Sequence, residues 1–270
     1  MGSRMALGAY RVPVVAFAAL LGLFLIAPFA VLLATSWTDG EFLTFPPQGF
    51  SLRWYTGLFG DTEWMGAFWT SIGVAGLATA VATVLAVAAA LGLTRLTGAG
   101  RIFRSLFVLP MAMPVIAYAL GLYDTVNRVP VLDDSLVPLI LGLVCLAFPM
   151  VFILVSGAIS GLDPALRPAA ATLGARWPTI VWKVELPLLR GAIAAGALFG
   201  FNLAFDEVVL SIFLIPPGTA TTLPLQMMNA SSEAISPELT AASTLVTLLS
   251  LLLLGGANLI SRRRGETRKS

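Results

Sequence analysis

Long apolar segments alternate with short charged segments along the whole of this chain. A helix needs about 20 apolar residues to cross a bilayer core about 30 Å thick. Six segments fit this requirement, and we predict that each forms a membrane-spanning helix: residues 12–37, 65–94, 105–123, 135–162, 191–215 and 239–261. The pattern therefore predicts an all-α, polytopic membrane protein in which residues 1–270 form a single transmembrane domain.

Two of these segments contain residues that spanning helices usually avoid. Pro110 and Pro114 lie within segment 105–123, where neighbouring helices can bind the backbone groups that a proline leaves free. Asp206 and Glu207 interrupt segment 191–215. At 1.5 Å per residue, Asp206 would lie about 22 Å beyond Gly191, which is past the midplane of the membrane.

The composition excludes a soluble globular protein. Hydrophobic residues make up 58% of the chain and charged residues 11%, and the mean hydropathy is +0.91. A soluble domain carries about 25% charged residues. The chain has no histidine and a single cysteine, Cys145, so it lacks the Ser–His and Cys–His nucleophile pairs. We expect no catalytic site, no cofactor and no resident metal.

The distribution of charge predicts the orientation, because cytoplasmic loops of membrane proteins are enriched in lysine and arginine. With six spans, all of the 16 lysines and arginines except Arg53 and Arg128 fall on one side, and most loop acids fall on the other. We therefore predict that both termini are cytoplasmic. The apolar part of the first segment exceeds the roughly 7–15 residues of a signal peptide, so we expect an uncleaved anchor helix.

The predicted cytoplasmic loop 163–190 is longer than a plain connection between two spans needs. Asp163 is a good N-cap residue, and Pro164 suits a first helical turn. Gly174 can end that helix in a left-handed conformation. A second helix is predicted to restart at Trp177 and to end near Leu186–Pro187. The loop is thus expected to be a rigid helix–turn–helix protrusion.

The same loop resembles the cytoplasmic loop of the membrane subunits of binding-protein-dependent ABC importers. That family pattern is Glu-Ala-Ala, three residues, Gly, nine residues, Ile, one residue, Leu-Pro. The matching positions of this chain are Ala169, Ala170, Gly174, Val184, Leu186 and Pro187. The glutamate position holds Pro168, which removes any ion pair that the family makes through that carboxylate.

The C-terminal part of the chain is similar to the second membrane subunit of the spermidine/putrescine permease branch. The likeness rests on residues 205–211, 217–218, 223–225 and 235–238. It implies a type I importer permease fold in the bacterial inner membrane and a small, amine-bearing or cationic solute. It also implies several partners: a second, homologous permease subunit, two cytoplasmic ATP-binding subunits that hydrolyse the ATP, and a periplasmic solute-binding protein. Nucleic acid is not among the expected partners, and membrane lipid is.

The acids inside the fifth segment are the candidate solute path. A charged side chain costs roughly 2.5–3.5 kcal/mol at the centre of a membrane helix, so a lipid-facing pair is disfavoured. Asn202 and Asp206 stand four residues apart and share a helix face, whereas Glu207 is turned about 100° away. The pathway hypothesis assigns Asn202, Asp206 and Glu207 to the solute. Alternatives for Asp206 are a helix-end hydrogen bond near the outer interface, a gate, or an ion pair between subunits.

Gly196 and Gly200 also stand four residues apart in this segment, and small residues at that spacing are typical of a helix-packing seam.

Two other functions compete with an importer subunit. A self-sufficient secondary transporter or channel would use further ionisable residues within the membrane, and the predicted spans contain none besides Asp206 and Glu207. That function also does not explain the long loop 163–190. A membrane enzyme is disfavoured because this chain has no histidine and no second aspartate within a predicted span. The sequence therefore favours a non-catalytic permease.

Overall fold

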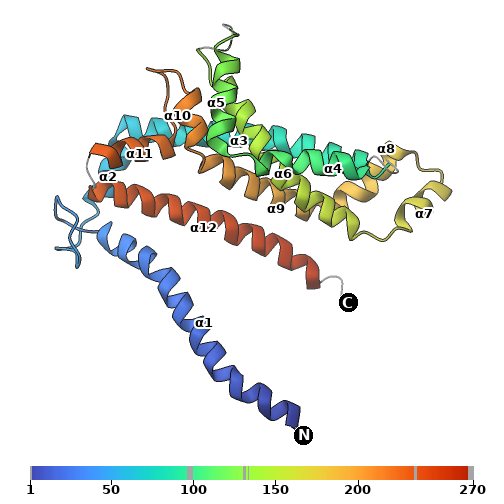
Figure 1. The fold of residues 1–270 in the computed structure, drawn as a ribbon, viewed down its shortest axis with the longest axis horizontal. Coiled ribbons are helices and arrows are strands. Elements are labelled where there is room, and N and C mark those ends of the chain that lie inside the picture. Colours follow the sequence, from blue (N-terminus) through green and yellow to red (C-terminus); the bar gives the residue numbers. More distant parts are fainter. Residues whose placement is uncertain (1, 96–99, 130–131, 133, 234–235, 267–270) are drawn as a thin grey trace. The chain divides into compact units, whose positions relative to one another are not determined.

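The computed structural model describes residues 2–95, 100–129, 132, 134–233 and 236–266, and all structural statements concern these residues. Their regular elements are all helical (Figure 1), which confirms the predicted all-α class. The elements are α1 Gly2–Thr35, α2 Arg53–Gly60, α3 Thr62–Leu93, α4 Gly100–Val108, η1 Leu109–Ala112, α5 Val115–Val126, α6 Val137–Ser160, α7 Leu166–Thr172, α8 Trp177–Ile180, the π-helical η3 Val181–Glu185, α9 Leu186–Phe205, α10 Val209–Leu214, α11 Leu223–Glu233 and α12 Pro237–Glu266.

Four helices of the described chain are long and apolar enough to cross a membrane: Pro13–Thr35, Thr62–Leu93, Val137–Ser160 and Trp177–Phe205. A bent pair, Gly100–Ala112 with Val115–Val126, and a shorter apolar stretch, Pro237–Leu253, correspond to the remaining two predicted spans. Each predicted apolar segment therefore has a helical counterpart.

The chain divides into two compact units, of which the first comprises Met1–Thr62 and Met227–Leu248. Within it, the connection between α1 and α2 is held by buried polar contacts. The Ser36 and Tyr55 hydroxyl groups are 2.7 Å apart, and the Trp54 indole N–H donates to the Thr38 carbonyl at 3.0 Å. The α1 side chains described from Pro13 onward are mostly exposed and apolar, as suits a helix that faces lipid or another subunit.

The second unit, Glu63–Gln226 with Leu249–Ser270, holds the core that positions the candidate site. Alanines of α3, including Ala86 and Ala90, pack against Val151, Phe152 and Val155 of α6. Aromatic contacts bring α4 onto the same face, because the Phe107 ring meets Phe148 and Phe152 edge-on at 5.4 and 5.3 Å. Small residues on α3 allow these helices to approach closely.

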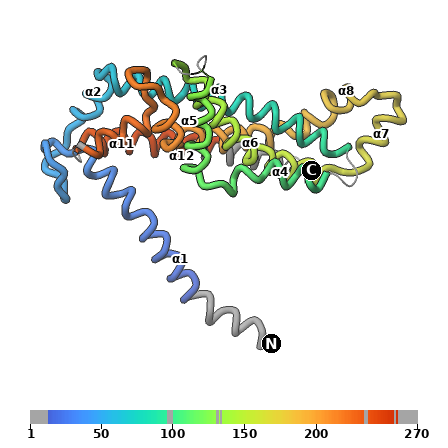
Figure 2. The backbone as a smooth tube through the Cα atoms, turned by 45° about the horizontal axis from the view of Figure 1, so that its top comes forward, coloured from blue at the N-terminus to red at the C-terminus, as the bar shows by residue number. Residues whose placement is uncertain are grey.

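The predicted third span, residues 105–123, is not a single straight helix. The axis turns by 95° between Gly100–Ala112 and Val115–Val126, as the smooth trace in Figure 2 also shows. The cause is local: Met113 and Pro114 adopt extended ψ angles of 136° and 122°. The residue before a proline is driven out of the helical region by steric clash, so Pro114 ends one helix and starts the next.

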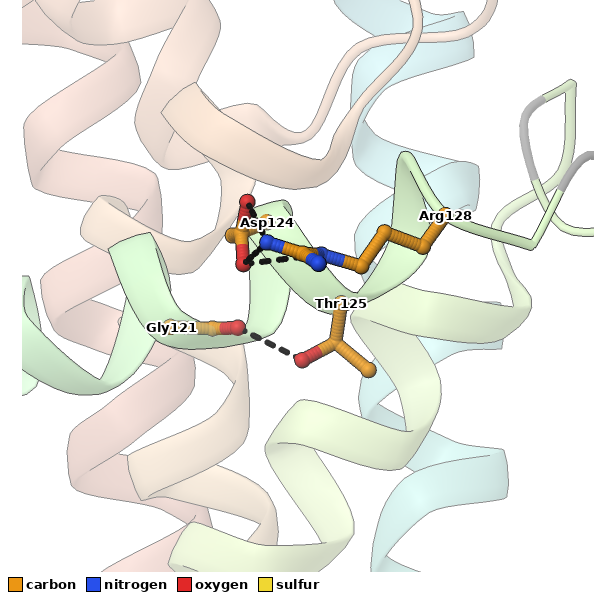
Figure 3. Close-up of polar contacts among 4 residues, drawn as sticks. All are labelled: Gly121, Asp124, Thr125 and Arg128. Atoms are coloured by element: carbon orange, nitrogen blue, oxygen red, sulfur yellow. Dashed lines mark hydrogen bonds and ion pairs between the residues drawn. The ribbon is translucent and has the colours of Figure 1, made fainter.

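Arg128, one of the two basic residues predicted to lie outside, has an acidic partner at the end of α5. Its guanidinium binds the Asp124 carboxylate at 2.9 Å, one helical turn earlier (Figure 3). Both side chains are largely exposed, so the pair is expected to stabilise the fold by only about 0.3–0.5 kcal/mol. The adjacent Thr125 hydroxyl donates to the Gly121 carbonyl at 2.8 Å.

Candidate functional site

The protruding helix of loop 163–190 is α7. It starts later than the sequence predicts and ends at the predicted glycine. Asp163 does not cap the helix; its carboxylate accepts the Ala165 N–H at 2.8 Å in an Asx turn, and α7 begins only at Leu166. With seven residues, the helix makes about two turns, fewer than a start at Pro164 would give. Its C-terminus is closed at Gly174, which has φ +81°.

The turn after α7 has the hydrogen bonds of a Schellman motif. The Gly174 N–H donates to the Ala171 carbonyl at 2.9 Å, and the Ala175 N–H donates to the Ala170 carbonyl at 3.1 Å. Both bonds require a left-handed residue at position 174, which a glycine adopts without strain. The prediction that Gly174 ends this helix is confirmed. Leu173, directly before it, is 89% exposed and forms an apolar tip.

The second helix of the loop does not end near Leu186–Pro187, as the sequence led us to expect. Helix runs continuously over Trp177–Phe205, through the π-helical segment Val181–Glu185 and into α9. The Leu186 N–H donates to the Val181 carbonyl, five residues back. This wider turn lies where the Pro187 ring would clash with a carbonyl of a regular α-helix, so the proline is tolerated without a break.

An ion pair that we did not predict ties α7 to this long helix. The Arg167 guanidinium of α7 donates through Nε to Oε1 of Glu185, which is 3% exposed. The only sequence signal was that Glu185 is the one acid between Asp163 and Asp206, among several cations. A second contact joins the loop to the end of α3, because the Arg95 guanidinium lies 4.2 Å above the Trp177 ring.

The two acids of the fifth segment have different surroundings. Asp206 ends α9, is exposed, and accepts a hydrogen bond from the Asn202 side-chain amide at 3.0 Å, as their shared helix face allows. Glu207 belongs to the break between α9 and α10. One oxygen of its carboxylate accepts the N–H groups of Val209 and Leu210, at 2.7 and 3.2 Å, at the start of α10.

The predicted coupling residues lie before and in the first half of the helix Trp177–Phe205, and the pathway residues lie at its other end. Ala169, Ala170 and Gly174 precede this helix, and Val184, Leu186 and Pro187 lie inside it. Loop residues 163–176 precede Trp177, and Asn202 and Asp206 close the other end, as Figure 1 shows for α7, α8 and α10. At 1.5 Å per residue, the 29-residue helix is about 43 Å long. The predicted single segment 191–215 is therefore replaced by a longer helix and the short α10 that follows it.

The glycines of α9 form the expected seam against α6. A Cβ atom built on Gly196 would approach Val151 Cα to 3.3 Å and Val151 Cγ1 to 3.1 Å. One built on Gly200 would approach Val151 Cγ2 to 3.2 Å. The α9 backbone therefore packs closely on Val151 at both positions, and at Gly196 it comes close to the backbone of α6 as well.

Comparisons with known sequences agree over most of the chain. The family described as "Binding-protein-dependent transport system inner membrane component" matches residues 82–265. The chain is 30% identical over 241 residues to the spermidine/putrescine transport system permease protein PotC of Escherichia coli strain K12, covering 88% of this chain and 90% of that one. It is 30% identical over 233 residues to the putrescine transport system permease protein PotI of the same strain, covering 83% and 81%. A putative ABC transporter permease protein of Streptomyces antibioticus is 33% identical over 180 residues, covering 65% of this chain and 78% of that one.

Solved structures share the fold. A chain of a bacterial ABC transporter that imports the acidic polysaccharide alginate superimposes with a TM-score of 0.74 at 16% identity, covering 97% of this chain and 99% of that one. A chain of the methionine ABC transporter MetNI in an inward-facing conformation gives a TM-score of 0.62 at 16% identity, covering 73% and 94%. At such identities the likeness concerns the fold alone.

Proposed function

Because this chain belongs to the family of binding-protein-dependent transport system inner membrane components, we propose that it forms part of the path by which an ATP-driven importer takes up a small cationic amine such as a polyamine. As a member of that family it is a permease subunit of an ABC importer and a multi-pass protein of the inner membrane. The polyamine is supported by the printed names of the permeases to which the chain is 30% identical. This relatedness favours an importer subunit over a self-sufficient secondary transporter or channel.

The loop 163–190 is proposed to receive the work of ATP hydrolysis. The observation that carries this assignment is the built shape of α7: a two-turn helix, closed by a Schellman motif at Gly174, with an exposed apolar tip at Leu173. Such a knob suits a cleft on another protein. Residues proposed to form or support the contact are Ala169, Ala170, Gly174, Val184, Leu186 and Pro187.

The proposed assembly contains a second, homologous permease subunit, two cytoplasmic ATP-binding subunits and a periplasmic solute-binding protein. ATP is proposed to be hydrolysed on the separate ATP-binding chains. Closure of those chains around ATP would displace α7. Since the chain continues from α7 through a four-residue turn into the helix Trp177–Phe205, the displacement would reach the far end of that helix.

That far end is proposed to meet the solute through Asn202 and Asp206. The exposed Asp206 carboxylate stands at the C-terminus of α9, where the helix dipole already concentrates partial negative charge. A cationic amine at this position would relieve the repulsion, whereas an anionic solute would add to it. Glu207 lies beside this position in the sequence, but its carboxylate already accepts the Val209 and Leu210 N–H groups, so the main contact with the solute is assigned to Asp206.

The coupling assignment is tested by Gly174→Val. Nothing lies within 4 Å of the added Cβ atom, so the expected effect comes from backbone strain at φ +81° and not from a clash. A β-branched residue in that conformation costs about 1–3 kcal/mol. We expect the uptake of radiolabelled spermidine, measured in proteoliposomes with all partner subunits, to fall at least about fivefold, the factor that corresponds to 1 kcal/mol.

The matched control is Gly174→Asn, because asparagine tolerates the left-handed conformation far better than valine. It should keep most of the uptake, and both variants should insert into the membrane in normal amounts. Wild-type uptake and spermidine-stimulated ATP hydrolysis in the valine variant would contradict the coupling assignment. If the wild-type assembly takes up no spermidine, the proposed solute is contradicted. The coupling test is then repeated with another amine that the assembly does take up.

A further inference from the structure

The ion pair between α7 and the long helix joins a partly exposed arginine to a buried carboxylate. We propose that Arg167 and Glu185 are a positioning pair, which locks α7 to the helix Trp177–Phe205 so that a push on α7 moves the helix instead of swinging the loop. The proposal rests on the assigned coupling role of loop 163–190. It names the contact through which that loop acts.

Glu185 belongs to the face of the helix that is fixed in the core. Val181, Glu185 and Leu189 follow one another at intervals of four residues and are 7%, 3% and 1% exposed. Val181 and Leu189 pack in one cluster with Leu91 of α3, and residues of α6 such as Ala158 and Ile159 cover it. The Glu185 carboxylate therefore cannot follow α7 if α7 moves. It is a fixed point to which α7 is attached.

α7, by contrast, has little else to hold it. None of its seven residues, Leu166–Thr172, is fully buried, and Leu166 and Ala170 are only half-buried, so apolar packing holds it weakly. Arg167 lies in its first turn, and this guanidinium is the side chain of α7 that reaches the buried carboxylate. A charge-assisted hydrogen bond from arginine to carboxylate is strong and directional, so it opposes displacement of α7 from the long helix.

The second carboxylate oxygen of Glu185 makes the pair sensitive to loss of its partner. Oε2 is buried and accepts no hydrogen bond within the described structure. A buried carboxylate is stable only while a cation compensates it, so removal of Arg167 leaves an unpaired charge in the core. The position next to Arg167 holds Pro168, where related loops carry a glutamate, so no acid beside it competes for this guanidinium.

The test measures how much solute is carried per ATP hydrolysed, in proteoliposomes that contain the full assembly and in which the wild-type chain takes up spermidine. Arg167→Met and Glu185→Gln should each lower this ratio about fivefold or more, within the range typical of coupling between sites. Because the two residues act as a unit, the double variant should lose no more than either single variant. ATP-binding subunits should remain bound in normal amounts, as measured by co-purification.

A covalent replacement distinguishes positioning from a general loss of stability. In a Cys145→Ser background, Arg167→Cys with Glu185→Cys should show the low ratio, and a bifunctional thiol reagent that spans the length of the original pair should restore it. Arg128→Gln, which breaks an exposed ion pair far along the sequence from the loop, is the matched control and should keep the wild-type ratio. Should Glu185→Gln fail to insert, Arg167→Met and the cross-linked variant still decide the question.

Two results would overturn the inference: a wild-type ratio in Arg167→Met, or a ratio that stays low after efficient cross-linking. Gly174→Val is measured in the same assay, so that a wrong role for the ion pair can be distinguished from a wrong coupling role for the loop. If Gly174→Val lowers the ratio and Arg167→Met does not, the loop couples without the ion pair. If neither lowers it, the coupling role of the loop is itself wrong.

Discussion

Asp206 and Glu207 are neighbours in the sequence, yet the helix dipoles favour the negative charge of Glu207 and oppose that of Asp206. Glu207 accepts two backbone N–H groups at the start of α10, where a negative charge is favoured by the helix dipole. Asp206 stands at the end of α9, where the dipole opposes it, and its side-chain bond comes from the uncharged Asn202 amide. An uncompensated negative charge therefore remains at Asp206, and a cation can use it.

Replacement of Asp206 by asparagine is expected to weaken transport of a cationic amine. The change keeps the volume and the hydrogen-bonding capacity of the side chain and removes its charge. A charge-assisted contact is worth about 1.5–3 kcal/mol, so the apparent affinity in uptake assays should drop about 10- to 100-fold. ATP hydrolysis without solute should hardly change.

Glu207→Gln is the matched control, because a glutamine carbonyl can still accept the Val209 and Leu210 N–H groups. It should transport nearly as well as the wild type if Asp206 alone meets the solute. Equal uptake by Asp206→Asn and wild type at all solute concentrations would favour a helix-end role for Asp206. Failure of that variant to assemble in detergent would indicate an ion pair between subunits.

At the scale of the elements, the helix Trp177–Phe205 is the part that links the two ends of the site. Its direction is set by the seam on α6, where Gly196 and Gly200 face Val151. Its continuity through Pro187 depends on the π-helical turn Val181–Glu185. Because this helix is continuous through Pro187 and packed against α6, we expect a displacement at its start to reach its far end.

Gly196→Val is therefore expected to destabilise the fold. The added carbons would meet the backbone of Val151, which cannot move aside as a flexible side chain could, and overpacking of this kind costs about 1–3 kcal/mol. The midpoint of thermal unfolding in detergent should fall by several degrees.

Gly157→Val on α6 is the comparison, since nothing lies within 4 Å of a Cβ atom at that position. It should unfold close to the wild-type temperature. Equal midpoints for the two variants would mean that the seam is looser than its distances indicate.

At the scale of the whole molecule, the orientation in the membrane stays a prediction from charge. Arg101, Gly174 and the C-terminal tail are expected to be cytoplasmic, and Gly49, Asp133 and Ser232 to face outward; Asp133 and residues 267–270 lie outside the described residues. Single cysteines in a Cys145→Ser background should react with an impermeant thiol reagent, added to intact cells or spheroplasts, only at the outward positions. Labelling at position 174 from outside would refute the six-span topology.

The sequence by itself determined the helical class, the family and the glycine turn that ends α7. Apolar segments of membrane-crossing length, the lack of histidine and the spacing from Ala169 to Pro187 are properties of neighbouring residues, so they can be read without a fold. The left-handed Gly174 and the shared face of Asn202 and Asp206 were predicted for the same reason: each depends on residues about one helical turn apart.

Only the tertiary structure decided what depends on distant residues or on competition between backbone preferences. Pro114 and Pro187 are both prolines in apolar segments, yet one accompanies a 95° bend and the other lies within a continuous helix, because a π-helical turn precedes the second alone. Glu207 caps α10 because the helix α9 ends at Phe205. The hydrophobic periodicity of the sequence did not predict that end. The Arg167–Glu185 pair joins residues 18 apart, and its significance comes from the burial of Glu185, whose helix neighbours Val181 and Leu189 pack in a cluster with Leu91 of α3. Burial is set by the packing of whole helices, and a linear pattern does not contain it.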